Sequence, residues 1–376
     1  MTEILCVVGA RPNFMKMAPV LEGLRAYPEI RPYLVHTGQH YGAEMSRVFF
    51  EELGLPKPDQ DLEIGSDTHA RQTARILMAF DDLLETRSAR LVVVVGDVNS
   101  TMACALAAVK REIPVAHVEA GLRSRDRSMP EEINRLVTDA VSEILFATSP
   151  DAVENLRAEG VPGSKIHLVG NPMIDTLMRH RPKAQARRAP ERHGLTPRKY
   201  AVVTLHRPSN VDDPVSLRRI LDALQTLATR IPVWFPVHPR TRERMKDLGF
   251  HPGPGFHLHE PLGYLDFLGL MGEATFVLTD SGGIQEETAA LGVPCLTLRA
   301  NTERPITVTE GTNRLLGDDP NAILPAAETI LSGNAPEPRC PELWDGKAGP
   351  RIARILASYV RSPVADTARP EPSPGR

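Results

Sequence analysis

Short apolar runs alternate with longer amphipathic stretches along most of the chain. In the first half, the apolar runs predict strands at residues 3–9, 32–36, 91–95, 115–118, 144–147 and 165–169. The intervening stretches carry apolar residues at helical spacing and predict helices at 16–26, 69–85, 100–111 and 130–141. This alternation is typical of βαβ units and predicts a mainly parallel sheet.

The alternation is interrupted at residues 179–198, which are rich in Arg, Pro and Ala and predict a linker or a solvated helix. It then restarts, with strands expected at 200–205, 232–237, 256–259, 275–279 and 294–298, and helices at 214–228, 240–248, 264–271 and 284–291. We therefore expect two Rossmann-like α/β domains, at 1–175 and 176–349. A helix at 350–361 is expected to dock back onto the first domain, and the Pro-rich residues 362–376 to form a disordered tail.

Composition and charge are those of an ordinary globular protein. Of the 376 residues, 41% are hydrophobic and 24% charged, and a net charge of -3 gives no reason to expect nucleic acid or an acidic membrane as partner. No basic segment followed by a long apolar run lies near the N-terminus, and no run reaches the ~18 apolar residues that span a bilayer. The four cysteines lie far apart, as in a reduced protein. A cytoplasmic location is the expectation.

Charged and glycine-rich groups recur where the predicted strands end. Because ligands of open parallel sheets bind beyond the carboxyl ends of the strands, these groups are candidates for one shared cleft between the two halves. They are Gly9-Ala10-Arg11-Pro12, Gly96-Asp97 and Glu119-Ala120-Gly121 in the first half, and His206-Arg207, His238-Pro239-Arg240 and Asp280-Ser281-Gly282-Gly283 in the second.

The segment Ser281-Gly282-Gly283 joins an apolar strand directly to a predicted helix. Small residues allow backbone N–H groups to approach a ligand, and a helix N-terminus attracts an anion, so the pattern favours a diphosphate site. Glu287, one helical turn later, could accept hydrogen bonds from ribose, and Arg304 could pair with a phosphate. An ordinary capped helix and a surface arginine remain the alternatives.

Three carboxylates of the first half, Asp97, Glu119 and Glu131, are candidates for proton transfer. If they converge, their mutual repulsion is expected to raise the pKa of at least one toward neutrality, as a general acid or base requires. Glu131 could instead be the ordinary acidic residue of a helix start. His206 closes a strand, and a purely structural histidine is its alternative.

Several chemistries lack their sequence signals. No GxGxxG motif opens a helix after a strand, which argues against a nicotinamide cofactor, and neither a P-loop nor a GxSxG elbow is present. His257 and His259 share a strand face but have no carboxylate or cysteine at ligand spacing. We expect neither a cofactor nor a metal.

Taken together, the motifs resemble those of the non-hydrolysing UDP-N-acetylglucosamine 2-epimerases, in order over residues 4–356. The matching strings are Gly9-Ala10-Arg11-Pro12, Lys16-Met17-Ala18-Pro19, Thr37-Gly38-Gln39-His40, Gly96-Asp97, His117 to Arg123, Pro130-Glu131-Glu132 with Asn134-Arg135, His206-Arg207, Thr279 to Glu287, and Thr302-Glu303-Arg304-Pro305. The resemblance implies a GT-B arrangement with the active site in the interdomain cleft, the nucleotide held mainly by the second half, and a homodimer.

The resemblance also implies a role for each matching residue. The catalytic group is Asp97, Glu119, Glu131 and His206; the residues that bind the UDP-sugar are Arg11, Lys16, Phe267, Ser281, Gly282, Gly283, Glu287 and Arg304. Ser281, Gly282 and Gly283 hold the diphosphate with help from Arg11, Glu287 binds ribose, Phe267 packs near uracil, and Arg304 contacts the phosphate or the sugar.

The implied reaction is the reversible conversion of UDP-N-acetylglucosamine to UDP-N-acetylmannosamine, through elimination of UDP, a glycal intermediate and re-addition. The chain departs from the family pattern at Pro208-Ser209-Asn210, so the resemblance does not fix the geometry of the loop after His206. It also departs at Tyr41, so the resemblance does not decide whether the substrate activates the enzyme. A hydrolysing epimerase, a GT-B glycosyltransferase, a 2-epimerase of another nucleotide sugar and a non-catalytic nucleotide-sugar sensor remain alternatives.

Overall fold

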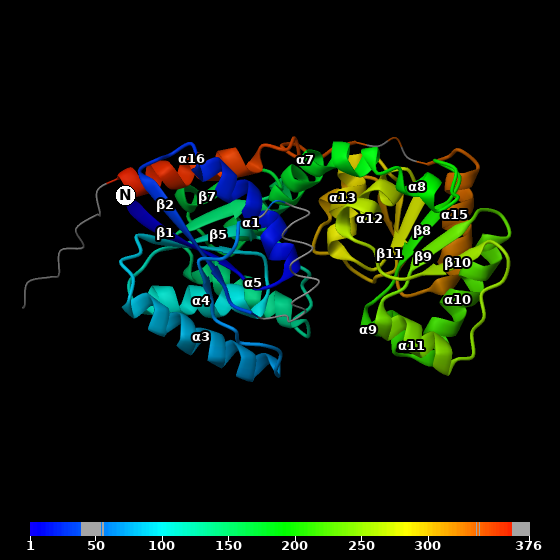
Figure 1. Ribbon diagram of the computed structural model, residues 1–376, viewed down its shortest axis with the longest axis horizontal. Helices are drawn as coiled ribbons and strands as arrows, with labels where there is room; N and C mark the ends of the chain where they lie inside the picture. The colour runs from blue at the N-terminus through cyan, green and yellow to red at the C-terminus, as the bar shows by residue number, and fades with distance from the viewer. Residues whose placement is uncertain (39–53, 55, 336, 338, 363–376) are drawn as a thin grey trace, which may run out of the picture.

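Two parallel β-sheets lie side by side in the computed structural model, which describes residues 1–38, 54, 56–335, 337 and 339–362 (Figure 1). The first sheet has seven strands in the order β3-β2-β1-β4-β5-β6-β7. Its strands are β1 (Thr2–Val8), β2 (Ile30–His36), β3 (Gln60–Asp61), β4 (Leu91–Val95), β5 (Val115–Ala120), β6 (Ile144–Ala147) and β7 (Ile166–Leu168). The α-helices of this half, among the described residues, are α1 (Arg11–Leu24), α3 (His69–Glu85), α4 (Asn99–Lys110), α5 (Pro130–Val141) and α6 (Pro150–Ala158).

The second sheet repeats this topology with six strands in the order β10-β9-β8-β11-β12-β13. Its strands are β8 (Ala201–Thr204), β9 (Val233–Pro236), β10 (Phe256–His259), β11 (Phe276–Thr279), β12 (Cys295–Thr297) and β13 (Asn313–Leu315). Its helices are α8 (Ala189–Arg192), α9 (Pro208–Val211), α10 (Pro214–Ala228), α11 (Pro239–Asp247), α12 (Tyr264–Gly272), α13 (Gly282–Leu291), α14 (Ile306–Thr309) and α15 (Ile323–Leu331).

Apolar side chains on both faces of the two sheets explain why these segments form buried parallel strands. All five residues of β4, Leu91–Val95, are buried, and so are the strand residues of β6. Near-continuous apolar runs of this kind are expected where helices cover both faces of a sheet. The predicted two-sheet α/β fold is therefore confirmed.

Both sheets reverse their strand order at one point, between β1 and β4 in the first and between β8 and β11 in the second. Helices on either side of such a switch point run on opposite faces of the sheet, which leaves a crevice at the carboxyl ends of the strands. Residues after β1 and β4 and residues after β8 and β11 therefore have the position where doubly wound sheets bind ligands.

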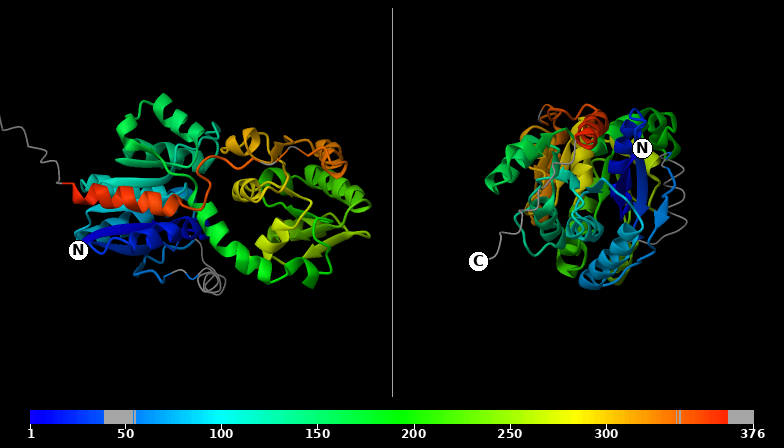
Figure 2. Two further views of the ribbon diagram at one scale, coloured as in Figure 1. Left: turned by 90° about the horizontal axis from the view of Figure 1, so that it is seen from above. Right: turned by 90° about the vertical axis from the view of Figure 1, so that its left-hand side faces the viewer.

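Helix α7 (Pro172–Ala186) connects the two halves, and α16 (Ala348–Arg361) brings the end of the chain back to the first half. Helix α7 packs against α1 and α16 on one side and against α12 and α13 on the other. Helix α16 lies alongside α1 (Figure 2). The carboxylate of Asp175 in α7 accepts hydrogen bonds from the first N–H groups of α16, at 3.0 Å from Ala348 and 2.7 Å from Gly349, and so fixes where the returning chain meets the first half.

The segment at 179–198 is largely the solvated helix that was expected between the two halves, since most of its residues are exposed. It continues α7 and then forms α8, and His180, Ala184 and Ala189 in it are buried. The short strands β3 and β13 were not predicted, because two or three residues are too few to show a period. Ser362 is exposed beyond α16, and residues 363–376, predicted to be a disordered tail, lie outside the described residues.

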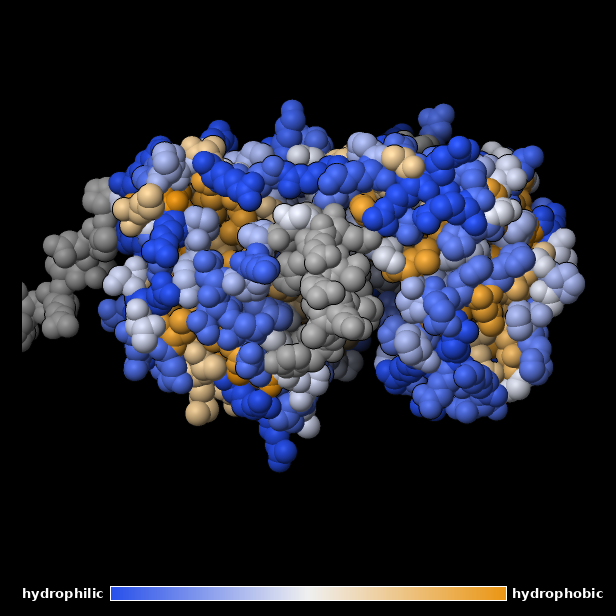
Figure 3. All heavy atoms as spheres, in the orientation of Figure 1, coloured by the Kyte–Doolittle hydropathy of each residue, from blue (hydrophilic) through white to orange (hydrophobic). Residues whose placement is uncertain are grey.

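The face seen in Figure 3 is mostly hydrophilic, with hydrophobic residues in small groups. Within the described part of the chain, no helix combines the length and the apolar character needed to cross a bilayer.

Candidate active site

The ends of β1 and β4 are tied together by Asn13, in the first turn of α1. Its Oδ1 accepts hydrogen bonds from the N–H groups of Gly9 and Ala10, at 3.2 and 2.9 Å, and its Nδ2 donates to the carbonyl of Val95 at 3.0 Å. This arrangement fixes the start of α1 at the switch point of the first sheet. Lys16 follows one turn later and is buried.

Glu119 lies at an irregularity of β5, where the pairing with β6 shifts register between Val118 and Ala120. Its backbone has φ +74°, a conformation that costs a non-glycine residue free energy and is often found at functional sites. Its side chain is buried and pairs with Lys16. Gly96, after β4, lies directly against this pair: a Cβ there would be in ordinary contact, at 3.5 Å from Glu119 Oε2 and 3.7 Å from Lys16 Nζ.

The other oxygen of Glu119 reaches the second half of the chain. Its Oε1 accepts a hydrogen bond from Arg304 Nη2 at 3.0 Å, and both side chains are buried. Burial raises the pKa of Glu119, but Lys16 and Arg304 lower it by more, so the carboxylate is ionised. The expected repulsion among carboxylates therefore does not govern this residue: its pKa moves down, because two cations lie against it.

Asp97 and Glu131 line one cavity of about 270 Å³ in the first half, together with His69, Gln72 and Asn99 among others. The Asp97 carboxylate accepts a hydrogen bond from Arg135 Nη1 at 2.5 Å, and its backbone carbonyl accepts one from Asn134 at 2.8 Å. Asp97 also lies near enough to Arg304 to influence its pKa. Two of the three expected carboxylates thus meet in one cavity, while Glu119 lies buried beside Arg304.

Arg135 is a site residue to which the sequence analysis assigned no role. It is buried on α5, and besides Asp97 it donates from Nη2 to Glu132 Oε2 at 2.9 Å. Glu132 in turn accepts hydrogen bonds from the N–H groups of Ser124 and Arg125, both at 2.9 Å. Arg135 therefore links the Asp97 carboxylate to the 124–125 turn. The sequence feature that could have identified Arg135 as a candidate is its position one helical turn after Glu131.

Arg304 is held by two carboxylates of its own half as well. Its Nε lies 2.9 Å from Glu286 Oε1, and its Nη1 donates to Glu303. Glu303 also accepts from Arg299 at 2.7 Å, and Glu286 from Asn171 at 2.9 Å. All of these side chains are buried. Burial lowers the pKa of Arg304, but Glu286, Glu303 and Glu119 raise it well above its ordinary value, so the guanidinium keeps its charge.

The Ser281-Gly282-Gly283 turn is immediately beside this arginine. Ser281 precedes the first residue of α13, and its N–H donates to Thr279 Oγ1 at 3.0 Å. A Cβ on Gly282 would lie 2.6 Å from Arg304 Nη1, so no larger residue fits there without moving the guanidinium, whereas nothing lies within 4 Å of a Cβ on Gly283. A helix N-terminus and a buried arginine therefore meet at one point, which suits an anion.

Glu287 lies one turn into α13 and accepts a hydrogen bond from Tyr264 at 3.0 Å. Burial raises the pKa of Glu287 to about 7, with the hydrogen bond from Tyr264 opposing and the nearby Glu286 adding to the rise. Near neutral pH this side chain can therefore both accept and donate hydrogen bonds, which suits the hydroxyl groups of a ribose.

The raised pKa of Glu287 predicts a pH-dependent stability that Glu287→Gln removes. The folded state binds the proton of Glu287 more tightly than the unfolded state does. Protonated Glu287 therefore contributes to the free energy of unfolding below the ordinary pKa, and this contribution is lost as pH rises through about 7. Above that pH, the free energy of unfolding is lower by about 3 kcal/mol than at low pH, as far as Glu287 is concerned. We expect the Tm of the wild type to fall more between pH 5 and pH 8 than that of the variant. Parallel Tm curves for the two proteins would contradict this.

His206 follows β8, and its Nδ1 lies 2.8 Å from Asp280 Oδ1. Burial raises the pKa of Asp280. Hydrogen bonds from His206, from the N–H of Arg207 and from the side chain of Asn210 lower it by more, so this carboxylate is ionised. His206 and Phe267 line a cavity of about 220 Å³ with Pro236, His238, Leu262 and Ile284 among others. This cavity belongs to the second half and is lined by neither Asp97 nor Glu131.

The departure from the family pattern at 208–210 builds the short helix α9. Pro208 occupies its first turn, and Asn210 donates to Asp280 Oδ2 at 3.2 Å and to the carbonyl of Leu298 at 3.0 Å. The loop after His206 is therefore fixed to the end of β11 and to the residue that follows β12.

Some expected features cannot be placed. The side chain of Arg11, expected at the diphosphate, and Gln39, His40 and Tyr41 lie outside the described residues. Among the residues that are described, no group of three or more His, Cys, Asp or Glu side chains has an arrangement suited to a metal ion.

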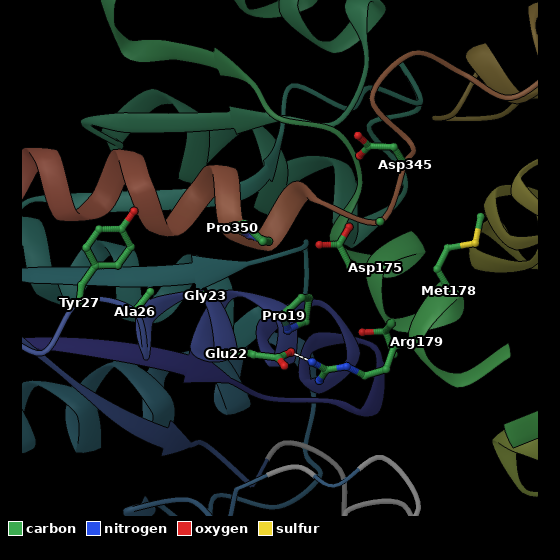
Figure 4. Close-up of a pocket in the computed structure, with 12 residues that line it drawn as sticks. Pro19, Glu22, Gly23, Ala26, Tyr27, Asp175, Met178, Arg179, Asp345 and Pro350 are labelled. Atoms are coloured by element: carbon green, nitrogen blue, oxygen red, sulfur yellow. Dashed lines mark ion pairs between the residues drawn. The ribbon is translucent and has the colours of Figure 1, made fainter. Parts of the chain in front are cut away.

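A larger cavity, of about 510 Å³, lies where α1, α7 and the start of α16 meet (Figure 4). Tyr27, Asp175, Met178 and Asp345 are among its lining residues, and Glu22 pairs with Arg179 at its edge. None of the expected substrate or catalytic residues lines it. We therefore select the candidate site by its chemistry and not by cavity size, and the buried residues around Glu119 and Arg304, where the two halves meet, are the candidates.

The fold and these residues define a class of protein. It has two Rossmann-like domains in the GT-B arrangement, and charged groups of both halves meet between them. A lipopolysaccharide outer core galactosyltransferase shares the fold alone, with a TM-score of 0.53 at 14% identity. The chain belongs to the UDP-N-acetylglucosamine 2-epimerase family, whose model matches residues 22–357. The predicted family is thus confirmed.

Similar proteins agree on the reaction class and differ in the sugar. The chain is 41% identical to a UDP-N-acetylglucosamine 2-epimerase of Methanocaldococcus jannaschii, over 94% of this chain and 98% of the relative. It is 42% identical to a UDP-2,3-diacetamido-2,3-dideoxy-D-glucuronate 2-epimerase of Pseudomonas aeruginosa, over 94% and 99%. A crystal structure of the M. jannaschii enzyme with UDP-GlcNAc and UDP has a TM-score of 0.85 at 40% identity and covers 95% of this chain and 100% of that one. The protein is a UDP-sugar 2-epimerase.

Proposed function

We propose that the protein interconverts UDP-N-acetylglucosamine and UDP-N-acetylmannosamine without releasing free sugar. The observation that carries the proposal is the contact between Glu119 and Arg304, at 3.0 Å. It joins a carboxylate of the first half to the arginine that lies against the Ser281-Gly282-Gly283 turn of the second. A sugar attached to a diphosphate at this turn would therefore be within reach of the first half.

The second half offers a place for each part of UDP. The apolar cavity lined by Phe267, Leu262 and Ile284 suits the uracil ring, and Glu287 suits the ribose. The N–H groups at the start of α13 and the Arg304 guanidinium suit the diphosphate. We assign Ser281, Gly282 and Gly283 to that diphosphate contact, and Lys16 to the pairing of Glu119.

The chemistry requires proton transfer and a stabilised leaving group. The C1–O bond breaks and its electron pair leaves on the UDP oxygen, where Arg304 and the helix N-terminus stabilise the charge. The cation at C1 acidifies the C2 proton, a carboxylate removes it, and the C–H electrons form the C1–C2 double bond of a glycal. In the reverse sense, a proton arrives on the opposite face of C2 and UDP adds back to C1. No net oxidation occurs, so these steps need no cofactor.

Asp97, Glu119 and Glu131 supply the carboxylates for two faces of C2. Asp97 and Glu131 share the cavity of about 270 Å³, while Glu119 lies beside Arg304. His206, paired with the Asp280 carboxylate, can take a positive charge beside the departing phosphate. This arrangement assigns proton transfer to the first half and departure of UDP to the second.

A second candidate substrate is a UDP-linked diacetamido uronate. It is favoured by the 42% identity to the P. aeruginosa enzyme, which equals the identity to a UDP-N-acetylglucosamine 2-epimerase of Methanococcus maripaludis. The reacting carbon and the leaving group are the same in both sugars, so the proposed residues serve either. Turnover of the two sugars side by side decides between them.

Incubation with UDP-N-acetylglucosamine in heavy water tests the reaction. We expect deuterium at C2 of both epimers, a mixture of the two nucleotide sugars, and no accumulation of free UDP. Epimers without deuterium at C2 would exclude the proposed proton abstraction. Free UDP together with N-acetylmannosamine would identify a hydrolysing enzyme instead.

The expected homodimer and cytoplasmic location stay predictions. Light scattering on the purified protein measures the first: we expect twice the 41.3 kDa mass of one chain. A monomer under assay conditions would contradict it.

A further inference from the structure

Arg304 is shared by three buried carboxylates, and one of them differs from the others in origin. Glu286 and Glu303 belong to the same half as Arg304. Glu286 lies 2.9 Å from Nε of Arg304, and Glu303 is in contact with Nη1. Glu119 comes from the first half and occupies Nη2 at 3.0 Å. The guanidinium therefore has two partners from its own half and one partner from the other half.

The two partners from its own half are themselves anchored. Glu303 accepts a hydrogen bond from Arg299 at 2.7 Å, and Glu286 accepts one from Asn171 at 2.9 Å. Arg304 would therefore keep its position if Glu119 withdrew. That position is against Gly282, where a Cβ would lie 2.6 Å from Nη1, at the start of the helix proposed to hold the diphosphate.

Glu119 has a second partner that does not depend on Arg304. Its Oε2 pairs with Lys16, on α1 of its own half. A diphosphate at the N-terminus of α13 would place further negative charge beside Arg304. Two anions held close together in a buried region repel each other strongly, since little water separates them. The diphosphate and the Glu119 carboxylate therefore favour the same guanidinium and oppose each other there.

We propose, resting on the function proposed above, that the diphosphate of the substrate and Glu119 compete for Arg304, so that substrate binding releases Glu119 from the arginine. Glu119 then keeps Lys16 as its cation and is free to turn toward the sugar. The arginine thereby couples occupation of the nucleotide site to the availability of a proton acceptor in the other half.

The electrostatics of Glu119 agree with this exchange. Burial raises the pKa of Glu119, and Lys16 and Arg304 together lower it below its ordinary value, which makes the carboxylate a weak base. Losing one of the two cations moves the pKa upward and makes a stronger base. The substrate would thus strengthen the base that acts on it.

Calorimetric titration with UDP tests the competition. We expect Glu119→Gln to bind UDP about tenfold more tightly than the wild type, because the amide no longer holds Arg304 by charge. The matched controls are Asp97→Asn and Glu131→Gln, which remove a carboxylate from the cavity of the same half without touching Arg304; both should bind UDP within about twofold of the wild type. Affinity of Glu119→Gln equal to or below that of these controls would overturn the proposal.

Glu119→Asp separates competition from a general effect of charge. The aspartate keeps the negative charge but is one methylene shorter, and aspartate tolerates the positive φ of this position better than glutamate. Competition for Arg304 predicts UDP binding tighter than that of the wild type; a pure charge effect predicts unchanged binding and overturns the proposal. If the wild type itself fails to bind UDP, it is the proposed function that fails.

Discussion

Asp97→Asn, Glu119→Gln and Glu131→Gln are each expected to lower turnover at least ~100-fold, because each removes a carboxylate assigned to proton transfer at C2. The substitutions preserve the shape of each side chain and keep one of the two acceptor oxygens. Arg135 can still donate to the amide oxygen that replaces the Asp97 carboxylate oxygen, at the present 2.5 Å contact or near it. The initial rate of UDP-N-acetylglucosamine epimerisation and of deuterium uptake measures the effect.

UDP affinity is the control for this prediction. Asp97 and Glu131 line the cavity of the first half, away from the apolar cavity of the second. Their variants should therefore bind UDP almost as the wild type does while turning over slowly. Near-normal turnover in all three variants would refute the assignment of proton transfer to these carboxylates.

Arg304→Gln is expected to destabilise the protein by about 3–5 kcal/mol, as is usual when one partner of a buried ion pair is removed. The glutamine leaves Glu119, Glu286 and Glu303 buried without their common cation. Because the same guanidinium is assigned to the diphosphate, UDP binding should weaken as well. Chemical denaturation and calorimetric titration measure the two effects.

Arg219→Gln is the matched control for this substitution. Arg219 pairs with Asp319 at 3.4 Å on the surface, where both side chains are half exposed. Exposed pairs contribute about 0–1 kcal/mol, so this variant should unfold almost as the wild type does. Equal losses of stability in the two variants would show that the buried contacts of Arg304 contribute no more to stability than an exposed ion pair.

The fold was predictable because its signal is local. Buried parallel strands such as β4 are continuous apolar runs, and the helices between them keep a 3.6-residue spacing, so both halves could be read from short windows of sequence. The packing of residues 179–198 could not, since Ala184 and His180 are buried by contacts with distant helices and not by an apolar period of their own.

The candidate site residues could be named from the sequence, but the contacts between them could not. Strand-end positions and motifs pointed to Asp97, Glu119, Glu131 and Arg304 one by one. The contacts of Glu119 with Lys16 and with Arg304 join residues that are 103 and 185 positions apart in sequence. No local pattern encodes such contacts, and without them repulsion was expected to raise the pKa of at least one of the three carboxylates, whereas the pKa of Glu119 is lowered. Glu303, next to Arg304 in its motif, could have been noticed as its partner.

A crystal structure with UDP and the sugar bound tests the central claim, that groups of the two halves act on one nucleotide sugar. We expect the diphosphate within hydrogen-bond distance of the N–H groups at Gly282 and Gly283 and of Arg304. C2 of the sugar should lie between carboxylates of the first half, with Asp97 and Glu131 near it. A diphosphate bound elsewhere, or a sugar that no carboxylate of the first half approaches, would contradict the account.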